Sequence, residues 1–289
     1  MKKLHFPKIK LFFTIIALSG FLGISACSNG ETGMREATAS RLATPVFMHE
    51  RIIPADPFAL TAFERVRKPG GNATIYIEGD GLAWSSRRTP SLDPTPVNPV
   101  ALHLATRDDG PNVIYLARPC QYSKLITPNI PCDGAYWTSK RLSLDVINAM
   151  NTALDNIKKR YGLKKMDLVG FSGGAGAAIL LAARRTDITS IRTVAGNLDH
   201  STFTAYHGVS PWVGSINPLH IAKKVNNIPQ YHFVGEWDEI IPQGAMAKFL
   251  RASGSERCIR YSIVREATHE KGWVARWPKM LHEPLDCMN

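Results

Sequence analysis

The sequence predicts an α/β fold, in which a mostly parallel central sheet of about eight strands has helices on both faces. Three observations support this fold class. Short runs rich in Val, Ile, Tyr and Phe alternate with segments of helical periodicity. The runs are largely apolar, as in strands that are covered on both sides. Glycine directly follows three of the runs and ends them.

The expected strands follow one another along the chain. Residues 47–53 and 58–66 look like an opening pair, and the β-rich run 73–77 stops at the acidic glycine turn 78–81. Further strands are expected at 113–117, 166–169, 188–195, 230–234 and 259–264. Ligands of such sheets bind beyond the carboxyl ends of the strands, so the segments after each strand matter most for function.

A long helix is expected over residues 144–161. Its apolar positions recur at helical spacing, namely Val146, Ile147, Met150, Leu154, Ile157 and Tyr161. Ser143 can cap the first turn, basic residues at 158–160 suit the negative end, and Gly162 can end the helix.

A signal peptide is expected over residues 1–26. Lysines precede an apolar stretch, residues 11–24, that is short for a membrane span. Small residues before Cys27 resemble the bacterial lipoprotein signal, in which cleavage leaves the cysteine as the lipidated N-terminus. The resemblance implies a lipid anchor at Cys27, and the lack of aspartate at position 28 implies the outer membrane, facing the periplasm. The alternatives are an ordinary secretory signal and an uncleaved anchor.

Residues 27–45 are polar and small, without apolar periodicity, and predict a flexible tether that follows the lipidated cysteine. Residues 46–289 are expected to form a single domain, because they contain no internal repeat and no second linker.

The formal net charge of +11 does not indicate nucleic-acid binding. The basic residues are dispersed in small groups, and no zinc-finger, RNP or basic-helix pattern accompanies them. Weak attraction to anionic lipid is the most that this charge supports. The sequence gives no indication of the oligomeric state.

Four cysteines remain after Cys27, and an even number in an exported protein suggests disulfides. One possible pairing joins Cys120 to Cys132 and Cys258 to Cys287. Free buried thiols are the alternative, and the sequence does not determine the connectivity.

The segment 170–174, Gly-Phe-Ser-Gly-Gly, is the most informative motif in the chain. It follows an expected strand and precedes a stretch of small residues with helical character. Glycine on both sides of Ser172 allows a sharp turn and close packing of the helix on the strand. The pattern matches the G-x-S-x-G nucleophile elbow in its strand–turn–helix context. A plain turn between a strand and a helix is the alternative.

A serine nucleophile needs an adjacent base, usually a histidine that a carboxylate orients. Asp238 lies in a turn just after the expected strand 230–234, and His269 follows the last expected strand. The chain order is therefore Ser172, Asp238, His269, with each residue after its own strand.

With these motifs, the chain resembles the α/β-hydrolase superfamily over nearly its whole body. The matching parts are the elbow at 170–174, the acid turn Gly-Glu-Trp-Asp-Glu-Ile-Ile-Pro at 235–242, and the late His269. The resemblance implies that Ser172 is the nucleophile, that His269 is the general base and then acid, and that Asp238 holds the imidazole tautomer.

The resemblance also implies an oxyanion hole made of two backbone N–H groups. One would come from Gly173, and the other from Asp80 or Gly81 in the turn after the third strand. Family members often have His-Gly in that turn, where this chain has Glu-Gly-Asp-Gly at 78–81. A carboxylate near a developing oxyanion would reduce the rate unless it points away.

Other residues compete for these roles. The rival bases are His200 and His207, in a segment expected to line a cap over the site, and His103, His220 and His282, which lie in helix-like stretches. The rival acids are Asp187, Asp199, Glu236 and Glu239. No metal or cofactor is expected, because the chain has no His-x-x-x-His or Cys-x-x-Cys pair and no phosphate-binding glycine motif.

The leading functional hypothesis is a serine hydrolase that cleaves a carboxylic ester through an acyl-enzyme. The ester is the substrate class that the family resemblance favours, and amide, thioester and acyl-transfer chemistry stay open. Residues 197–227 and 82–99 could cover the serine and select a small-molecule or lipid-like acyl substrate. The alternatives are a non-catalytic envelope lipoprotein that binds a ligand or partner through this fold, and a purely structural tethered protein.

Overall fold

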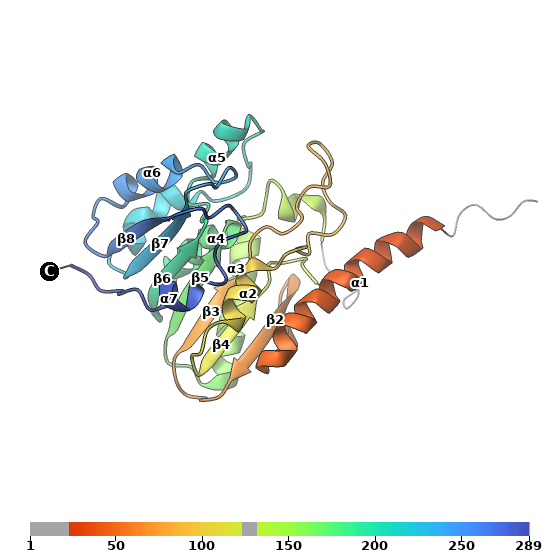
Figure 1. Cartoon of the computed structure of the whole chain (residues 1–289), viewed down its shortest axis with the longest axis horizontal. Helices are drawn as coiled ribbons and strands as arrows, with labels where there is room; N and C mark the ends of the chain where they lie inside the picture. The colour runs from red at the N-terminus through yellow and green to blue at the C-terminus, as the bar shows by residue number, and fades with distance from the viewer. Residues whose placement is uncertain (1–22, 123–131, 289) are drawn as a thin grey trace, which may run out of the picture.

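A computed structural model describes residues 23–122 and 132–288 of the chain, and the expected signal peptide lies mostly outside them. Its centre is a sheet of eight strands in the order β1-β2-β4-β3-β5-β6-β7-β8 (Figure 1). The strands are β1 (His49–Ala55), β2 (Phe58–Val66), β3 (Ala73–Ile77), β4 (Asn112–Leu116), β5 (Met166–Phe171), β6 (Ile188–Val194), β7 (Gln230–Gly235) and β8 (Ile259–Val264). All eight strands expected from the sequence are present.

Strand direction brings the expected site residues to one edge of the sheet. The pairings β1·β2 and β2·β4 are antiparallel, and all pairings from β4 to β8 are parallel. In the centre, Ile77 at the end of β3 is in register with Leu116 of β4 and Gly170 of β5. The turns that follow β3, β5, β7 and β8 therefore open on the same side of the molecule.

Helices cover both faces of the sheet (Figure 1). The helical elements are α1 (Gly23–Ala43), η1 (Thr44–Val46), α2 (Val100–Thr106), η2 (Gly134–Trp137), α3 (Leu144–Tyr161), α4 (Gly173–Ala182), α5 (His200–His207), η3 (Pro218–Val225), α6 (Gly244–Ser253) and α7 (Trp277–Leu281). One buried apolar cluster joins the sheet to α3, α4, α6 and η3, and the other joins it to α1, α2 and α7. Ile75 and Ile77 of β3 belong to the first cluster and Tyr76 to the second, because successive side chains of a strand point to opposite faces.

The helix α3 has the bounds and caps that the sequence predicts. The Ser143 side chain accepts a hydrogen bond from the backbone N–H of Val146 at 3.4 Å. Gly162 ends the helix in the left-handed conformation, with φ 61°. Its buried stripe packs against the sheet, so local signals and tertiary burial agree here.

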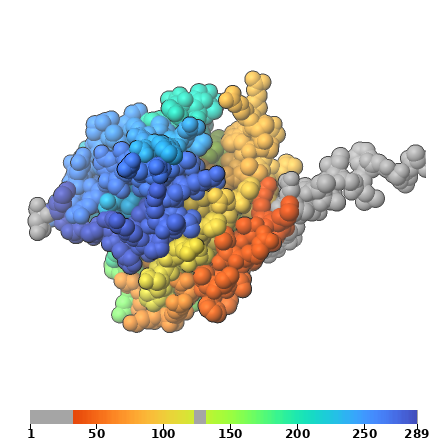
Figure 2. Space-filling view, in the orientation of Figure 1, coloured from red at the N-terminus to blue at the C-terminus, as the bar shows by residue number. Residues whose placement is uncertain are grey.

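The segment after Cys27 differs from the flexible tether that the sequence predicts. Residues Gly23–Ala43 form the helix α1, whose C-terminal part packs against the body beside α2 (Figure 2). Ala39 and Ala43, four residues apart, are fully buried there. Arg35 donates hydrogen bonds to the carbonyl oxygens of Asp93 and Thr95 at 3.3 and 3.2 Å. The prediction was wrong because the buried positions are alanines, which give no strong apolar stripe.

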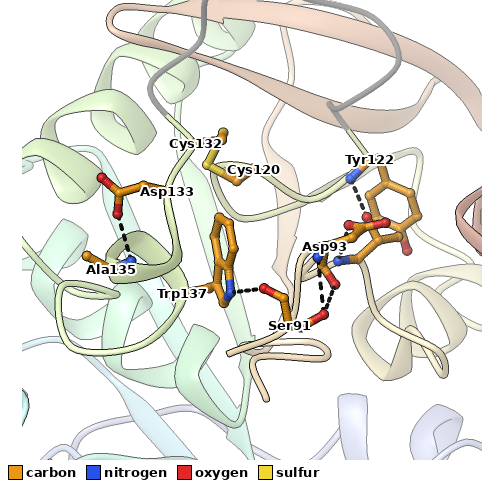
Figure 3. Close-up of a disulfide and its surroundings, with 9 residues drawn as sticks. Ser91, Asp93, Cys120, Tyr122, Cys132, Asp133, Ala135 and Trp137 are labelled. Atoms are coloured by element: carbon orange, nitrogen blue, oxygen red, sulfur yellow. Dashed lines mark hydrogen bonds between the residues drawn. A yellow bond between two sulfur atoms is a disulfide. The ribbon is translucent and has the colours of Figure 1, made fainter. Parts of the chain in front are cut away.

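Both disulfides of the suggested pairing are present. Cys120 is joined to Cys132, and Cys258 to Cys287. Figure 3 shows Trp137 beside the first bond, with its indole N–H directed at the carbonyl oxygen of Ser91, 3.0 Å away. The second bond connects the start of β8 to the C-terminal segment. Disulfides persist in oxidising compartments, so they indicate an exported protein.

Within residues 23–122 and 132–288, the structure contains no helix with the length and apolar character needed to cross a membrane.

Candidate active site

Ser172 lies at a sharp turn between β5 and α4. Its φ and ψ angles are 51° and −119°, a conformation that costs energy for a residue with a side chain. The neighbouring strand stabilises the turn, since the Ser172 N–H donates to the carbonyl oxygen of Val194 at 3.0 Å. The turn places the hydroxyl at the carboxyl edge of the sheet, as the sequence predicts for a nucleophile elbow.

Two glycines allow the turn after β3 to approach this elbow. A Cβ atom on Gly79 would lie 3.0 Å from the Phe171 ring and 3.3 Å from the Ser172 Cβ atom. A Cβ atom on Gly173 would overlap the Asp80 carboxylate. The turn 78–81 therefore packs directly against the serine. A side chain on either glycine would push the turn and the elbow apart.

Asp238 lies in the turn after β7, and its side chain is only 1% exposed. Its Oδ1 atom accepts hydrogen bonds from the backbone N–H groups of Ile240 and Ile241, both at 2.9 Å. These two bonds fix the carboxylate and leave Oδ2 directed at His269, 3.1 Å from its Nδ1 atom. The backbone of this turn therefore orients the carboxylate toward the imidazole.

His269 follows β8 and lies between the carboxylate and the serine. Its Nε2 atom is 3.0 Å from the Ser172 Oγ atom. The Trp273 indole donates to the His269 carbonyl oxygen at 3.0 Å, and the Phe171 ring lies 5.2 Å from the imidazole, centroid to centroid. The imidazole side chain is 16% exposed, so a substrate can reach it.

The structure thus brings Ser172, Asp238 and His269 into one hydrogen-bonded chain, although 97 residues separate the serine from the histidine. An ionised carboxylate can only accept, so His269 Nδ1 donates its proton to Asp238. Nε2 is then free to accept the proton of the serine hydroxyl. This arrangement can activate a hydroxyl for attack on an acyl carbonyl.

The rival histidines lie elsewhere. His200 and His207 belong to α5 in the segment 197–227, where His200 stacks on Trp212 and His207 Nε2 lies 2.8 Å from the Ile240 carbonyl oxygen. Burial lowers the pKa of His200. The other three lie in helical elements: His103 in α2, His220 in η3, and His282 at the end of α7.

The rival acids have structural partners. Asp187 forms ion pairs with Arg185 and Lys158 at 2.8 and 2.5 Å. Asp199 caps α5 by accepting from the Ser201 N–H. Glu236 accepts from the Glu266 N–H at 2.9 Å, and Glu239 is exposed. None of them forms a hydrogen bond with His269 or Ser172.

The backbone around the elbow has free donors at the expected place. The N–H groups of Gly173, Asp80 and Gly81 form no hydrogen bond with any residue in the described ranges. Gly173 opens α4, and the first N–H groups of a helix lack intrahelical partners. These groups can together hold a developing oxyanion.

Sequence reasoning missed two arginines that bind Asp80. The Asp80 carboxylate lies 2.6 Å from Arg141 Nη1 and 3.5 Å from Arg118 Nη1. The Arg118 guanidinium also donates to the Arg141 carbonyl oxygen. The two cations offset the negative charge that was expected to disfavour an oxyanion near this turn. The available signal was the position of Arg118, which directly follows the apolar run 113–117 at the carboxyl edge where ligands of such sheets bind.

A cavity of about 310 Å³ opens onto the serine and the histidine. Its walls come from residues 78 and 80–84, from 96–98, from 240–241 and 269–270, and from Arg141, Asn197 and Phe203. The segments 82–99 and 197–227 both contribute, as the sequence predicts. Within the described residues, no cluster of His, Cys, Asp or Glu side chains could hold a metal ion.

Glu78 is a second acid in this wall, and it is 1% exposed. Burial raises its pKa to about 7, although its Oε1 atom accepts from the backbone N–H groups of Gly79 and Ala101. Its Oε2 atom is buried, and an interaction with the Tyr115 hydroxyl lowers the pKa of Glu78 by less than burial raises it. A protonated Glu78 would remove the cost of a buried charge at this position.

Solved structures resemble this architecture. An α/β serine hydrolase homologue from Coxiella burnetii aligns with a TM-score of 0.55 and 14% identity, covering 81% of this chain and 95% of its own. The chain has the α/β-hydrolase fold. An esterase from Pyrococcus furiosus aligns with a TM-score of 0.54 and 13% identity, covering 82% of this chain and 91% of its own.

An α/β serine hydrolase without a lid, from Xanthomonas campestris, aligns with a TM-score of 0.52 and 12% identity, over 81% of this chain and 91% of that one. No protein-family model matches the sequence. No curated protein matches it either. At these identities the likeness shows the fold and not the activity.

Proposed function

We propose that this protein is a serine hydrolase that cleaves a carboxylic ester through an acyl-enzyme on Ser172. The single observation that supports the proposal most is the hydrogen-bonded chain from Ser172 Oγ through His269 to Asp238, at 3.0 and 3.1 Å. A structural turn would need neither the imidazole nor the fixed carboxylate.

Each residue then has a defined role. Ser172 Oγ attacks the acyl carbonyl while His269 Nε2 takes its proton, and Asp238 stabilises the imidazolium. The N–H groups of Gly173 and of Asp80 or Gly81 hold the oxyanion. The protonated His269 then gives its proton to the leaving alcohol. A water molecule, activated by the same imidazole, releases the acid and restores the serine.

We also propose that a lipid on Cys27 anchors this enzyme at the outer membrane, on the periplasmic side. Small residues before this cysteine support the anchor, and the two disulfides support export. Cell fractionation of the full chain beside Cys27→Ser tests this part. Release of the variant from the membrane fraction is expected, and an unchanged distribution would contradict the anchor.

Covalent labelling with a fluorophosphonate probe tests the catalytic part. The protein from residue 33 onward should be labelled, Ser172→Ala should not, and the exposed-serine control Ser86→Ala should be labelled like the wild type. Absence of labelling in a folded wild type would favour the alternative of a non-catalytic binding protein.

A further inference from the structure

Arg141 is a nearly buried arginine in the wall of the candidate active site. It lies between η2 and α3, it is 6% exposed, and it lines the same cavity as Ser172 and His269. In the proposed chemistry it offsets the charge of Asp80 but takes no direct part in any step. A charged side chain kept in so little contact with water needs a reason.

Three contacts hold the Arg141 guanidinium in one orientation. Nη1 donates to Asp80 Oδ2 at 2.6 Å, and Nε donates to the Thr138 carbonyl oxygen at 2.6 Å. The guanidinium carbon lies 3.9 Å from the centroid of the Trp212 ring, which is a cation–π contact. Nη2 forms no hydrogen bond with a residue in the described part of the chain. A fixed guanidinium with a free edge is suited to bind an anionic oxygen group.

The charges around Arg141 are not balanced within the protein. Asp80 is shared with Arg118, which is 5% exposed, so two buried arginines face one carboxylate. Glu78 is bonded to backbone N–H groups, and Glu270 is exposed at the rim, where it accepts from Asn98 at 3.1 Å. The cluster of Asp80, Arg118 and Arg141 therefore keeps one positive charge in excess, and an anionic ligand would offset it.

The cavity also differs between its inner and outer parts. Glu78, Arg141 and Asn197 are each at least nine-tenths buried, and the Oδ1 atom of Asn197 is buried without a partner among the described residues. The outer rim has the exposed apolar side chains of Trp84, Val97 and Ile240 in the same cavity. The alcohol of an ester must leave toward solvent before water can enter, so the buried polar part suits the acyl group.

We propose that Arg141 binds an anionic oxygen group on the acyl part of the substrate. The preferred esters are then those of short acids with a second acidic group, of which a half-ester of a dicarboxylic acid is the simplest example. This inference rests on the proposed serine hydrolase function and specifies its substrate class.

A matched pair of esters tests the proposal. Monoethyl glutarate and ethyl pentanoate share the alcohol and have similar acyl lengths, and they differ in a terminal carboxylate. The wild type should show the higher kcat/KM on monoethyl glutarate. Arg141→Gln should lower the ratio of the two kcat/KM values roughly 10- to 100-fold, mainly through KM, as expected for loss of a charged hydrogen bond. Arg141→Lys should retain part of the ratio.

Two control variants separate binding from positioning. Arg118→Gln removes the same charge from Asp80, but Arg118 does not line the cavity. The ratio of the two kcat/KM values in Arg118→Gln should stay near that of the wild type. An equal loss of this ratio in Arg118→Gln and Arg141→Gln would mean that Arg141 acts only through Asp80. Arg184→Gln makes the same charge change on the exposed surface, where Arg184 binds Asn148, and should leave both kcat/KM values unchanged.

A measurement on the wild type remains decisive if Arg141→Gln does not fold. Free glutarate should slow fluorophosphonate labelling of Ser172, and its uncharged diamide, glutaramide, at equal concentration and ionic strength should not. Equal effects of glutarate and glutaramide, or a higher kcat/KM on ethyl pentanoate, would overturn the inference while the hydrolase proposal stands. A folded protein that the probe does not label would instead overturn the hydrolase proposal.

Discussion

Asp238→Asn should nearly abolish activity without displacing the side chain. In the structure, Asp238 Oδ1 accepts from two backbone N–H groups, and Oδ2 faces His269. An asparagine must keep its carbonyl oxygen toward the two N–H groups, so its NH₂ group faces His269 Nδ1. A donor there requires Nδ1 to accept, and the proton moves to Nε2, where it blocks removal of the serine proton.

The expected loss in kcat is roughly 10³–10⁴-fold, or about 4–5.5 kcal/mol in transition-state free energy. The assay is ester hydrolysis, with fluorophosphonate labelling rates as a second readout and thermal unfolding as a check on the fold. Glu239→Gln, a change of the same kind on the exposed neighbour, is the control and should keep wild-type rates. An Asp238→Asn rate within tenfold of the wild type would refute the assignment of Asp238 as the orienting acid.

Three further predictions concern other parts of the molecule. Gly173→Ala should lower kcat/KM roughly 10²–10³-fold, because the new Cβ would overlap the Asp80 carboxylate and displace an oxyanion donor. Wild-type kinetics in this variant would contradict the placement of the turn 78–81 against Gly173. Replacing Cys258 and Cys287 together by serine should lower the free energy of unfolding by about 3–4 kcal/mol in denaturant titrations, since the bond closes a separation of 29 residues. Burial alone would raise the pKa of Asp187, but hydrogen bonds from Arg185 and Lys158 lower it to about 2. The stability that Asp187 contributes should therefore be full above about pH 4 and lost as the pH falls to about 2. In thermal scans, the unfolding temperatures of Asp187→Asn and the wild type should then converge at acid pH. A difference in unfolding temperature that stays constant with pH would argue against the ion pairs.

The strands could be predicted because their signals are local. The apolar β-rich runs predicted all eight strands. The first strand begins two residues later than predicted, because Phe47 adopts a left-handed conformation, with φ 60°, before β1 begins. The helix α1 could not be predicted, because its stability comes from contacts of Arg35 and small alanines with distant residues.

The same distinction holds for the site. Ser172, Asp238 and His269 each follow a strand, so parallel topology alone places them at one edge. The Asp80 cluster depends on side-chain contacts across 38 and 61 residues of sequence, and neither arginine lies in a motif. The acid Asp80 in the turn was visible in the sequence as a departure from the family pattern. Its partners Arg118 and Arg141 could be identified only from the structure.

The most direct test of the central claim is to locate the acyl group during turnover. The reaction with 4-nitrophenyl acetate would be quenched in acid and the protein mapped by peptide mass spectrometry. We expect one acetyl group on the peptide that contains Ser172, and no ester hydrolysis above background by Ser172→Ala. Hydrolysis that persists in Ser172→Ala, or an acetyl group on another residue, would contradict the acyl-enzyme on Ser172.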